Sequence, residues 1–287
     1  MFFCNSHSRG VKSVKWQVMV FLFFVLATPT AVLAQGDSGF LRGAGKLDIA
    51  LTAFSDRYDS FWFGPDRRTD PPFGEVTRDS LNLYVSYGLN DTMDLTVLAA
   101  YVESETEAVF EGEKDFQDSV VQFKWLVHSW AVNSGKVNVL LTPSIKVPLS
   151  DYENDAVPAI GDGQVDFRFR GVIQYHLNNG AYIALETGYD VRRDLPENEV
   201  PIHLMGGFSI GKNLILSGFY SNLNSLDGYD ISEGPFYGVQ EDIEKVGINA
   251  HYWVLEGFGV TAGYGDTLSG RNTGDVKSYS LGTVFRF

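Results

Sequence analysis

Apolar and polar residues alternate along most of the chain from about Lys46 onward. About twelve segments share this pattern, and none of them shows the 3.6-residue period of an amphipathic helix. Between Met93 and Tyr101, for example, every second residue is apolar, and Asp94 and Thr96 lie on the other phase. A period of two predicts strands with two unlike faces. The sequence therefore predicts an all-β fold.

Alternation alone does not separate a membrane barrel from a soluble lipocalin-like barrel, in which the two faces are inverted. The lengths of the connections favour the membrane barrel, because short turns on one rim and long loops on the other are typical of outer-membrane barrels. The turn between Trp130 and Lys136 is longer than its class should be. The short turns are Gly88–Asp91, Leu177–Gly180, Gly211–Lys212 and Leu255–Gly257, and the long polar loops span about 57–75, 103–116, 150–163, 222–240 and 268–275.

Aromatic residues also tend to end the apolar phase, where a membrane barrel places its interfacial girdles. Tyrosine favours strands in any protein, so the position of these residues supports a membrane barrel only together with the other features. The last segment is itself a strand pattern that ends in Phe287, and it resembles the C-terminal signal read by barrel assembly machinery. The residues of that candidate signal are Tyr279, Leu281, Phe285 and Phe287, and the girdle candidates are Tyr87, Tyr101, Tyr175, Tyr189, Tyr252, Tyr264 and Tyr279.

The N-terminus has the layout of a secretory signal peptide. Arg9, Lys12 and Lys15 precede the apolar run from Val18 to Ala27, and small residues before Gln35 offer a cleavage point at Ala34. The apolar run is too short to span a bilayer as a helix. Removal of residues 1–34 takes away the one cysteine, Cys4, and moves the net charge from −14 to −17. We expect export through the periplasm to the outer membrane, with membrane lipid and the assembly machinery as partners.

The expected architecture is a transmembrane antiparallel up-and-down β-barrel of about twelve strands over residues 46–287. Residues 35–45 are either a periplasmic tail or an internal plug. Two features do not fit the simple pattern. Pro143 falls inside an apolar phase although proline cannot donate to a strand ladder. In the segment Leu214–Leu223 the apolar phase switches, so either Leu214 and Leu216 or Phe219 and Leu223 face lipid.

Charged residues within strands are expected to point into the lumen, because a charge on the lipid face costs ~2–4 kcal/mol near the midplane. They form either a salt-bridge lattice that holds the wall or a set that lines a selective path. The lumen-lining candidates are Arg78, Lys124, Lys146, Asp166, Arg168, Arg170, Glu186, Asp190, Arg192 and Lys245.

Signals for chemistry are weak. The histidines of the mature chain lie on four different segments without metal-ligand spacing, so no metal, cofactor or catalytic site is predicted. Ser209 and His203 share one strand phase, but i and i+6 lie roughly 20 Å apart. Acidic loops such as Asp151–Asp162 and Asp227–Glu233 lack the spacing of a calcium loop. The strong negative charge also excludes nucleic acid as a partner.

Three short motifs resemble the transporter-like barrels of the family named after a MetA pathway of phenol degradation. They are Tyr87–Asp91 (YGLND), Thr142-Pro143-Ser144 through Pro148, and Gly161–Gly163 leading into Asp166-Phe167. The resemblance spans roughly residues 45–265, and that family tolerates a proline such as Pro143. It implies passive uptake of small, often hydrophobic or aromatic compounds across the outer membrane.

The leading hypothesis for function is a passive channel for small solutes. The first alternative is a non-conducting structural or adhesive barrel whose acidic loops contact partners. The second is a membrane-embedded hydrolase with a His–Ser or Asp–His pair assembled across strands.

Overall fold

The computed structural model describes residues 38–107, 112–153, 159–192, 198–231, 233–234 and 238–287. The expected leader, residues 1–34, and the first three residues of the segment 35–45 lie outside this range. Among the described residues, no helix is long and apolar enough to cross a membrane.

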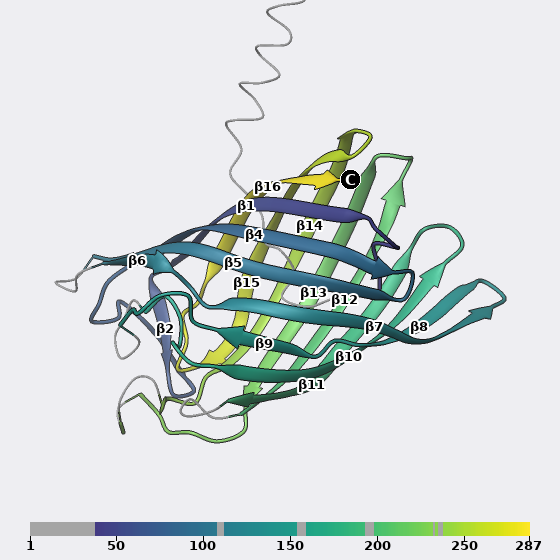
Figure 1. Ribbon diagram of the computed structural model, residues 1–287. Coiled ribbons are helices and arrows are strands. Elements are labelled where there is room, and N and C mark those ends of the chain that lie inside the picture. The colour runs from purple at the N-terminus through teal and green to yellow at the C-terminus, as the bar shows by residue number, and fades with distance from the viewer. Residues whose placement is uncertain (1–37, 108–111, 154–158, 193–197, 232, 235–237) are drawn as a thin grey trace, which may run out of the picture.

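The first and last long strands close one antiparallel sheet into a barrel (Figure 1). β1 (Leu47–Tyr58) pairs with β4 on one side and with β16 on the other. The wall holds twelve strands, one of which is interrupted and carries two labels, so the predicted fold class is confirmed. After β1 the wall strands are β4 (Val76–Asn90), β5 (Met93–Thr106), β7 (Ser119–Val132), β8 (Gly135–Leu141) with β9 (Ser144–Val147), β10 (Asp166–Leu177), β11 (Tyr182–Arg192), β12 (Glu199–Ile210), β13 (Leu214–Ser225), β14 (Asp242–Leu255), β15 (Phe258–Arg271) and β16 (Lys277–Arg286).

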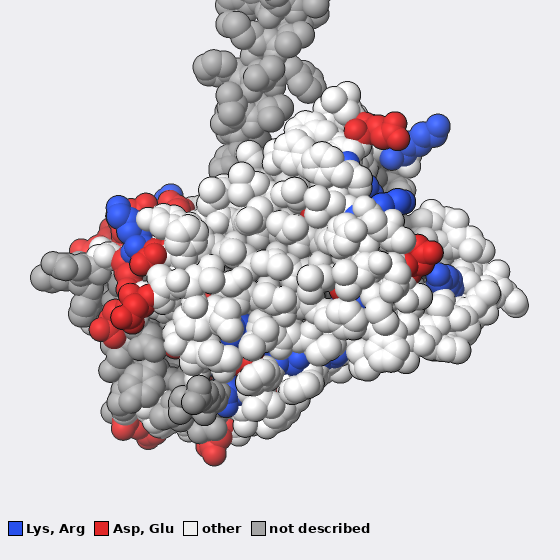
Figure 2. Space-filling view, viewed as in Figure 1, with Lys and Arg blue, Asp and Glu red and all other residues white. Residues whose placement is uncertain are grey.

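The apolar phase of the wall faces outward. On β4, Leu81 and Leu83 are exposed, whereas Ser86 on the other phase is fully buried. On β11, Ile183 and Leu185 are exposed and the intervening Ala184 is buried. An exposed apolar band around a closed sheet is the arrangement that suits lipid. Figure 2 shows this band as an almost uncharged central surface, with acidic side chains gathered at the end of the barrel that carries the long connections.

β13 shows which of its two phases faces outward. Its register with β12 places Leu216 opposite the exposed Phe208 and Leu214 opposite the exposed Ile210. Phe219 lies opposite the buried Met205 and is itself buried. Leu214 and Leu216 therefore face outward, while Phe219 and Leu223 face the interior.

The proline and the long turn have simple structural accounts. Pro143 lies in the gap between β8 and β9, where its carbonyl still accepts a hydrogen bond of 2.9 Å from the Phe123 amide. The expected long turn after Trp130 is wrong: Val132 pairs with Gly135, which leaves two turn residues. A β-bulge between Leu126 and His128 shifts the alternation of inward and outward residues. The sequence pattern therefore does not show where this strand ends.

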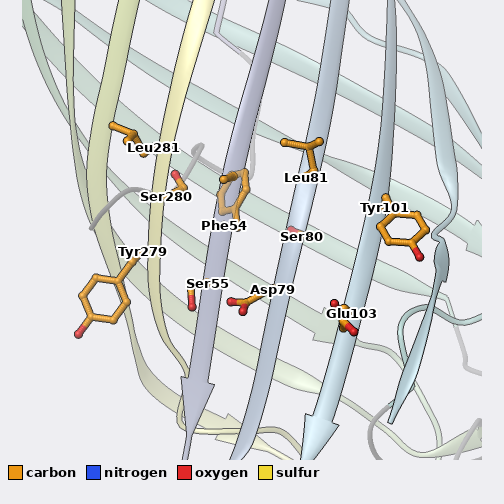
Figure 3. A pocket seen from close by; sticks show the side chains of 11 residues that line it. Phe54, Ser55, Asp79, Ser80, Leu81, Tyr101, Glu103, Tyr279, Ser280 and Leu281 are labelled. Carbon is orange, nitrogen blue, oxygen red and sulfur yellow. The ribbon is translucent and has the colours of Figure 1, made fainter. Parts of the chain in front are cut away.

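The two ends of the barrel differ. The turn end carries the short connections, and the loop end carries the long ones. Several strands run further into the expected loops than predicted, for example β13 to Ser225 and β15 to Arg271. On the outer wall near the loop end, Ser55, Leu81 and Leu281 are among the residues that line a hollow of about 490 Å³ (Figure 3). Tyr101 and Tyr279 flank it at the level where the apolar band gives way to Asp79 and Glu103.

A hairpin at the loop end is packed against other loops. β2 (Ser60–Phe63) and β3 (Asp66–Thr69) form a separate two-stranded sheet, and β6 (Glu113–Phe116) pairs with β5. Phe61 is 2% exposed and packs against Phe73 and Val76, with Ile231 of the next-to-last long loop beside them. The Trp62 amide donates to the Thr273 carbonyl at 2.8 Å. The hairpin therefore ties three long connections together at this mouth.

Candidate functional site in the barrel interior

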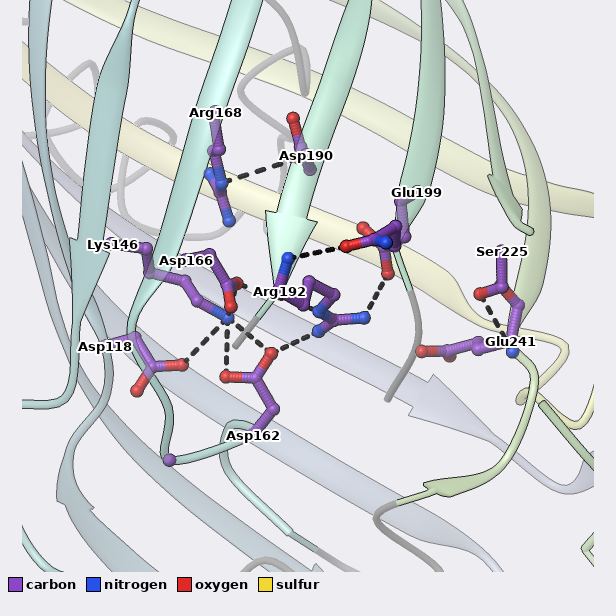
Figure 4. A network of polar contacts seen from close by, with 12 residues as sticks. Asp118, Lys146, Asp162, Asp166, Arg168, Asp190, Arg192, Glu199, Ser225 and Glu241 are labelled. Atoms are coloured by element: carbon purple, nitrogen blue, oxygen red, sulfur yellow. Dashed lines mark hydrogen bonds and ion pairs between the residues drawn. The ribbon is translucent and has the colours of Figure 1, made fainter. Parts of the chain in front are cut away.

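All ten charged residues singled out in the sequence lie on the inward phase of their strands. Lys124, Lys146, Asp166, Glu186 and Asp190 are buried. Arg78, Arg168, Arg170 and Arg192 are partly buried, as is Lys245, which lies opposite the buried Ser221 and Thr267. Most of them belong to one network on the inner face of β9–β12, close to the loop end (Figure 4).

Lys146 is the centre of this network. Its ammonium lies 2.5 Å from a carboxylate oxygen of Asp166, 3.5 Å from Asp118 and in contact with Asp162. Asp166 is the direct neighbour of Lys146 across the β9–β10 ladder, whereas Asp118 and Asp162 come from loops. One cation thus joins three carboxylates.

Arg192 lies beside Lys146 and extends the network to β12. Its guanidinium pairs with Asp162 and with Glu199, and its Nε lies 3.7 Å from Asp166. Asp166 and Arg192 face each other across β10 and β11, so the register itself brings opposite charges together.

The connection between β9 and β10 folds over the inner wall. Its Ile160 is fully buried against Ala100 and Val102 of β5. Arg78 Nη2 donates to the Ala159 carbonyl at 2.7 Å, and Gln117 Nε2 donates to the Ile160 carbonyl at 2.5 Å. We call the described residues 159–165 the inner loop, because they narrow the interior near the loop end.

The acidic groups in and beside the inner loop differ in how strongly nearby positive charges favour their ionised forms. Burial acts to raise the pKa of Asp162, but the positive charges of Lys146 and Arg192 outweigh it and hold that pKa well below its usual range. Burial and the hydrogen bond with Asp162 raise the pKa of Asp118. Burial and the contact with Asp118 also raise the pKa of Tyr152, whose hydroxyl donates to that carboxylate.

Arg168 and Arg170 share a single carboxylate. Arg170 binds Asp190 through two nitrogens, with Nε at 2.9 Å and Nη2 at 2.5 Å. Arg168 lies 3.5 Å from the same Asp190, and its buried Nε has no hydrogen-bond acceptor in the described part of the chain. Arg168 therefore shares its nearest carboxylate with Arg170, which holds that carboxylate more closely.

A serine and a histidine also meet in this region. Ser221 Oγ lies 2.8 Å from His203 Nδ1, and His203 Nε2 lies 3.5 Å from Arg170 Nη1. Ser209, which the strand spacing places roughly 20 Å from His203, is not part of this pair. A catalytic serine needs a histidine whose second nitrogen is held by a carboxylate, and here a guanidinium stands in that place.

An apolar layer follows the charged network on the side of the turn end. Its buried members come from successive strands of the same wall. Phe54 of β1, Tyr182 of β11 and Leu41 of the N-terminal segment pack against it. We call this layer the apolar belt; its buried residues are Leu140, Val172, Ala184, Met205 and Phe219.

Residues 38–45 lie against the inner wall on the turn-end side of the apolar belt. Lys124 Nζ donates to the carbonyls of Ser38 and Phe40 at 3.0 and 3.2 Å. The Gly39 amide donates to Gln174 Oε1 at 2.9 Å. The segment leaves the barrel wall at Gly88, where a Cβ atom would come within 1.9 Å of a backbone oxygen of the segment. Only glycine leaves room there, which gives a physical reason for the YGL motif.

Arg42 links this segment to the barrel closure. It pairs with Asp48 of β1, and its amide donates to Asp94 Oδ2 at 2.9 Å. Asp48 also accepts two hydrogen bonds from Arg286 of β16, at 2.9 and 2.8 Å.

Sequence reasoning missed several members of the interior. Glu199 and His203 lie on the polar phase of β12 and could have been found by extending the alternation through that strand. Asp118 and Asp162 lie in loops, where no periodic signal exists. Two members of the predicted set lie elsewhere on the inner face: Lys124 binds the carbonyls of Ser38 and Phe40, and Lys245 lies opposite Ser221 and Thr267. Among the described residues, no group of His, Cys, Asp and Glu is placed to hold a metal ion.

Solved structures with the same fold are outer-membrane barrels. An outer membrane channel from Pseudomonas putida F1 matches with a TM-score of 0.73 at 12% identity, covering 88% of this chain and 100% of that one. The translocator domain of the autotransporter NalP from Neisseria meningitidis matches with a TM-score of 0.50 at 11% identity, covering 96% and 95%. The NanC porin also gives 0.50 at 11% identity, covering 83% and 98%.

No curated protein sequence matches the chain. A family model does match it, over residues 32–282, which is nearly the whole length. That agrees with the resemblance carried by the YGL turn and the Pro143 strand. The chain belongs to the family described as the "MetA-pathway of phenol degradation".

Proposed function

We propose that this protein is a passive outer-membrane channel for small solutes that carry an apolar or aromatic part. The main observation behind the proposal is the composition of the interior, where a charged network at the loop end is followed by the apolar belt. A purely polar path would suit ions and sugars. A charged surface followed by an apolar one suits molecules that have one charged or polar part and one apolar part. The similarity to an outer membrane channel and a porin supports the proposal.

The exposed apolar band supports a place in the outer membrane, with the loop end outside and the turn end in the periplasm. Export after cleavage at Ala34, and assembly through the C-terminal strand that ends in Phe287, are parts of the same proposal. In the described structure Leu281 and Phe285 face outward on β16, and the Phe287 backbone pairs with Leu47.

Single-channel recording in a planar bilayer tests the proposal. We expect small conductance steps from the full chain, because residues 38–45 and the inner loop occupy part of the interior. Deletion of residues 38–44, which include Arg42, should enlarge the steps. The control Lys136→Gln also removes one positive charge, but at the exposed turn, and should leave the steps unchanged. Folded protein that stays silent in both forms would overturn the channel.

One observation favours a second candidate, a non-conducting structural barrel. Residues 38–45 and the inner loop enter the interior from its two ends and are both held by buried or partly buried cations. If they fill it, the barrel would serve through its surface. The full chain separates the two candidates, because a channel conducts with the segment in place, whereas a filled barrel is silent until the segment is removed.

A further inference from the structure

Arg168 is the guanidinium of the interior network whose charge is least matched. Its nearest carboxylate oxygen, on Asp190, is 3.5 Å away, and its Nε has no acceptor in the described residues. The side chain keeps 24% of its surface exposed although it lies on the inner face of β10. A guanidinium offers five donors in a fixed fork that fits a carboxylate. Arg168 therefore presents unused donors to the interior.

The carboxylates around Arg168 are already engaged by other cations. Asp190 is bound in bidentate fashion by Arg170. Asp166 is held by Lys146, and Glu199 by Arg192.

The remaining neighbours do not neutralise Arg168 either. His203 Nδ1 is hydrogen-bonded with Ser221 Oγ, and His203 Nε2 faces Arg170. Glu186 is 1% exposed at the level of Val172, so its carboxylate is covered rather than presented to open space.

The apolar belt begins within reach of this guanidinium. Arg168, Arg170 and Val172 are successive inward positions of β10, so Val172 lies roughly 13 Å along the strand from Arg168. Across the neighbouring strands, Ala184 and Met205 continue the apolar surface, and Phe219 supplies an aromatic ring. The belt residues are at most 8% exposed, because side chains such as Leu41 of the N-terminal segment pack against them. A molecule of this length can therefore hold its charged end on Arg168 and reach the belt with its apolar body by displacing Leu41.

We propose that Arg168 and the apolar belt form an interior binding site for small amphiphilic carboxylates, with the carboxylate on the Arg168 guanidinium. This rests on the proposed channel and names the class of solute that it takes: organic acids with an aromatic or aliphatic body. The acid accepts hydrogen bonds from the terminal nitrogens of the guanidinium, because Nε is buried and faces Asp190. The neighbouring Arg170 adds a second positive charge that disfavours cationic amphiphiles.

The test uses the full mature chain and three probes of one shape. The probes are 4-phenylbutanoate, its neutral amide, and 4-phenylbutylamine. Binding to the detergent-solubilised protein is measured by calorimetry, and block of the single-channel current is measured in a planar bilayer. We expect the acid to bind and block at about tenfold lower concentration than the amide, and the amine to be weakest.

Three variants assign the preference to Arg168. Arg168→Gln should remove the difference between acid and amide, and Arg168→Lys should keep part of it because the charge remains without the fork. Lys136→Gln should behave as the wild type. A heat-modifiable gel shift verifies that each variant is a closed barrel.

The outcomes separate this site from the channel. A conducting wild type that binds acid and amide equally overturns the carboxylate site and leaves the channel standing, as does an Arg168→Gln barrel that keeps the preference. A barrel that binds the acid selectively but never conducts overturns the channel and keeps the site.

Discussion

Ser221 on β13 and His203 on β12 are joined across their strand pair inside the barrel, with 2.8 Å between Oγ and Nδ1. Both side chains are buried, so the contact is shielded from water. The second ring nitrogen of His203 faces the Arg170 guanidinium at 3.5 Å. A neighbouring cation opposes protonation of the imidazole, which a general base must undergo. The geometry of the pair therefore differs from that of a catalytic dyad, in which a carboxylate holds the second ring nitrogen.

We accordingly expect no hydrolysis that depends on this pair. Assays with short p-nitrophenyl esters and with phospholipid vesicles should give the same background rate for the wild type, Ser221→Ala and His203→Gln. A clear rate that both substitutions abolish, and that Ser209→Ala preserves, would restore the hydrolase alternative.

The orientation of the wall can be tested on two adjacent residues of β14. Ile248 is 65% exposed on the outer face, and Asn249 lies on the inward phase. Ile248→Arg places a charge in lipid at a cost of ~2–4 kcal/mol, whereas Asn249→Arg places it in the interior. We expect Ile248→Arg to lower the yield of folded barrel in vesicles, measured by the heat-modifiable shift, and Asn249→Arg to fold nearly normally. Equal yields would mean that the outer band does not face lipid.

The wall was predictable from the sequence because its cause is local. Lipid on one side and a polar interior on the other impose a two-residue period on each strand, as Leu81 and Leu83 show. Where both phases are mixed, as at Leu214–Leu223, the outward set follows only from pairing with β12. The bulge between Leu126 and His128 likewise shifts the phase and concealed the tight turn at residues 133–134.

The site was predictable only in part. Inward cations such as Lys146 and Arg192 follow from the cost of charge in lipid, so the set could be named. Their partners could not, because Asp118 and Asp162 lie in connections whose position is fixed by distant contacts. Ile160 packs against Ala100 and Val102, some sixty residues earlier in the chain, and no periodicity encodes such a contact.

The inner loop should respond to acid through two carboxylates of opposite behaviour. The pKa of Asp162 is held below its usual range, so its contribution is present above the ordinary carboxyl pKa and is lost as pH falls through the lowered value. The pKa of Asp118 is raised, so its ionised form disfavours the docked loop and protonation relieves it. At neutral pH, Asp162→Asn should loosen the loop by about 1.5–3 kcal/mol, whereas Asp118→Asn should leave it equal or tighter.

Hydrogen exchange of the inner-loop amides measures this difference. In the wild type, protection should hold or rise slightly as Asp118 protonates. It should decline only below about pH 4, where Asp162 of the undocked loop protonates while Asp162 of the docked loop stays ionised. If Asp118→Asn loosens the loop as much as Asp162→Asn does, the assignment of the two carboxylates is wrong.

Lys124 should control the docking of the N-terminal segment. Its ammonium donates to the carbonyls of Ser38 and Phe40, and Lys124→Met keeps the length of the side chain but removes the donor. Loss of two charge-assisted hydrogen bonds should weaken docking by about 1.5–3 kcal/mol for each bond. We expect faster exchange of the Gly39 amide and more frequent large conductance steps. Lys245→Met, which removes another inward charge remote from the segment, should change neither.

Arg286 should stabilise the closed barrel through Asp48. It joins β16 to β1 by two hydrogen bonds of 2.9 and 2.8 Å, and its guanidinium stacks over Trp253 at 4.7 Å. Arg286→Ala leaves Asp48, whose side chain is 3% exposed, with Arg42 as its remaining partner in an ion pair. Because the Arg286 side chain is itself 46% exposed, we expect a loss of about 1–2 kcal/mol rather than the full cost of a buried pair. The measurement is the temperature at which the gel shift of the closed barrel disappears. Arg286→Lys should recover less than half of the loss, since lysine cannot form the bidentate pair or stack in the same way. Full recovery by lysine would mean that charge alone, and not the fork geometry, holds the seam between the first and last strands.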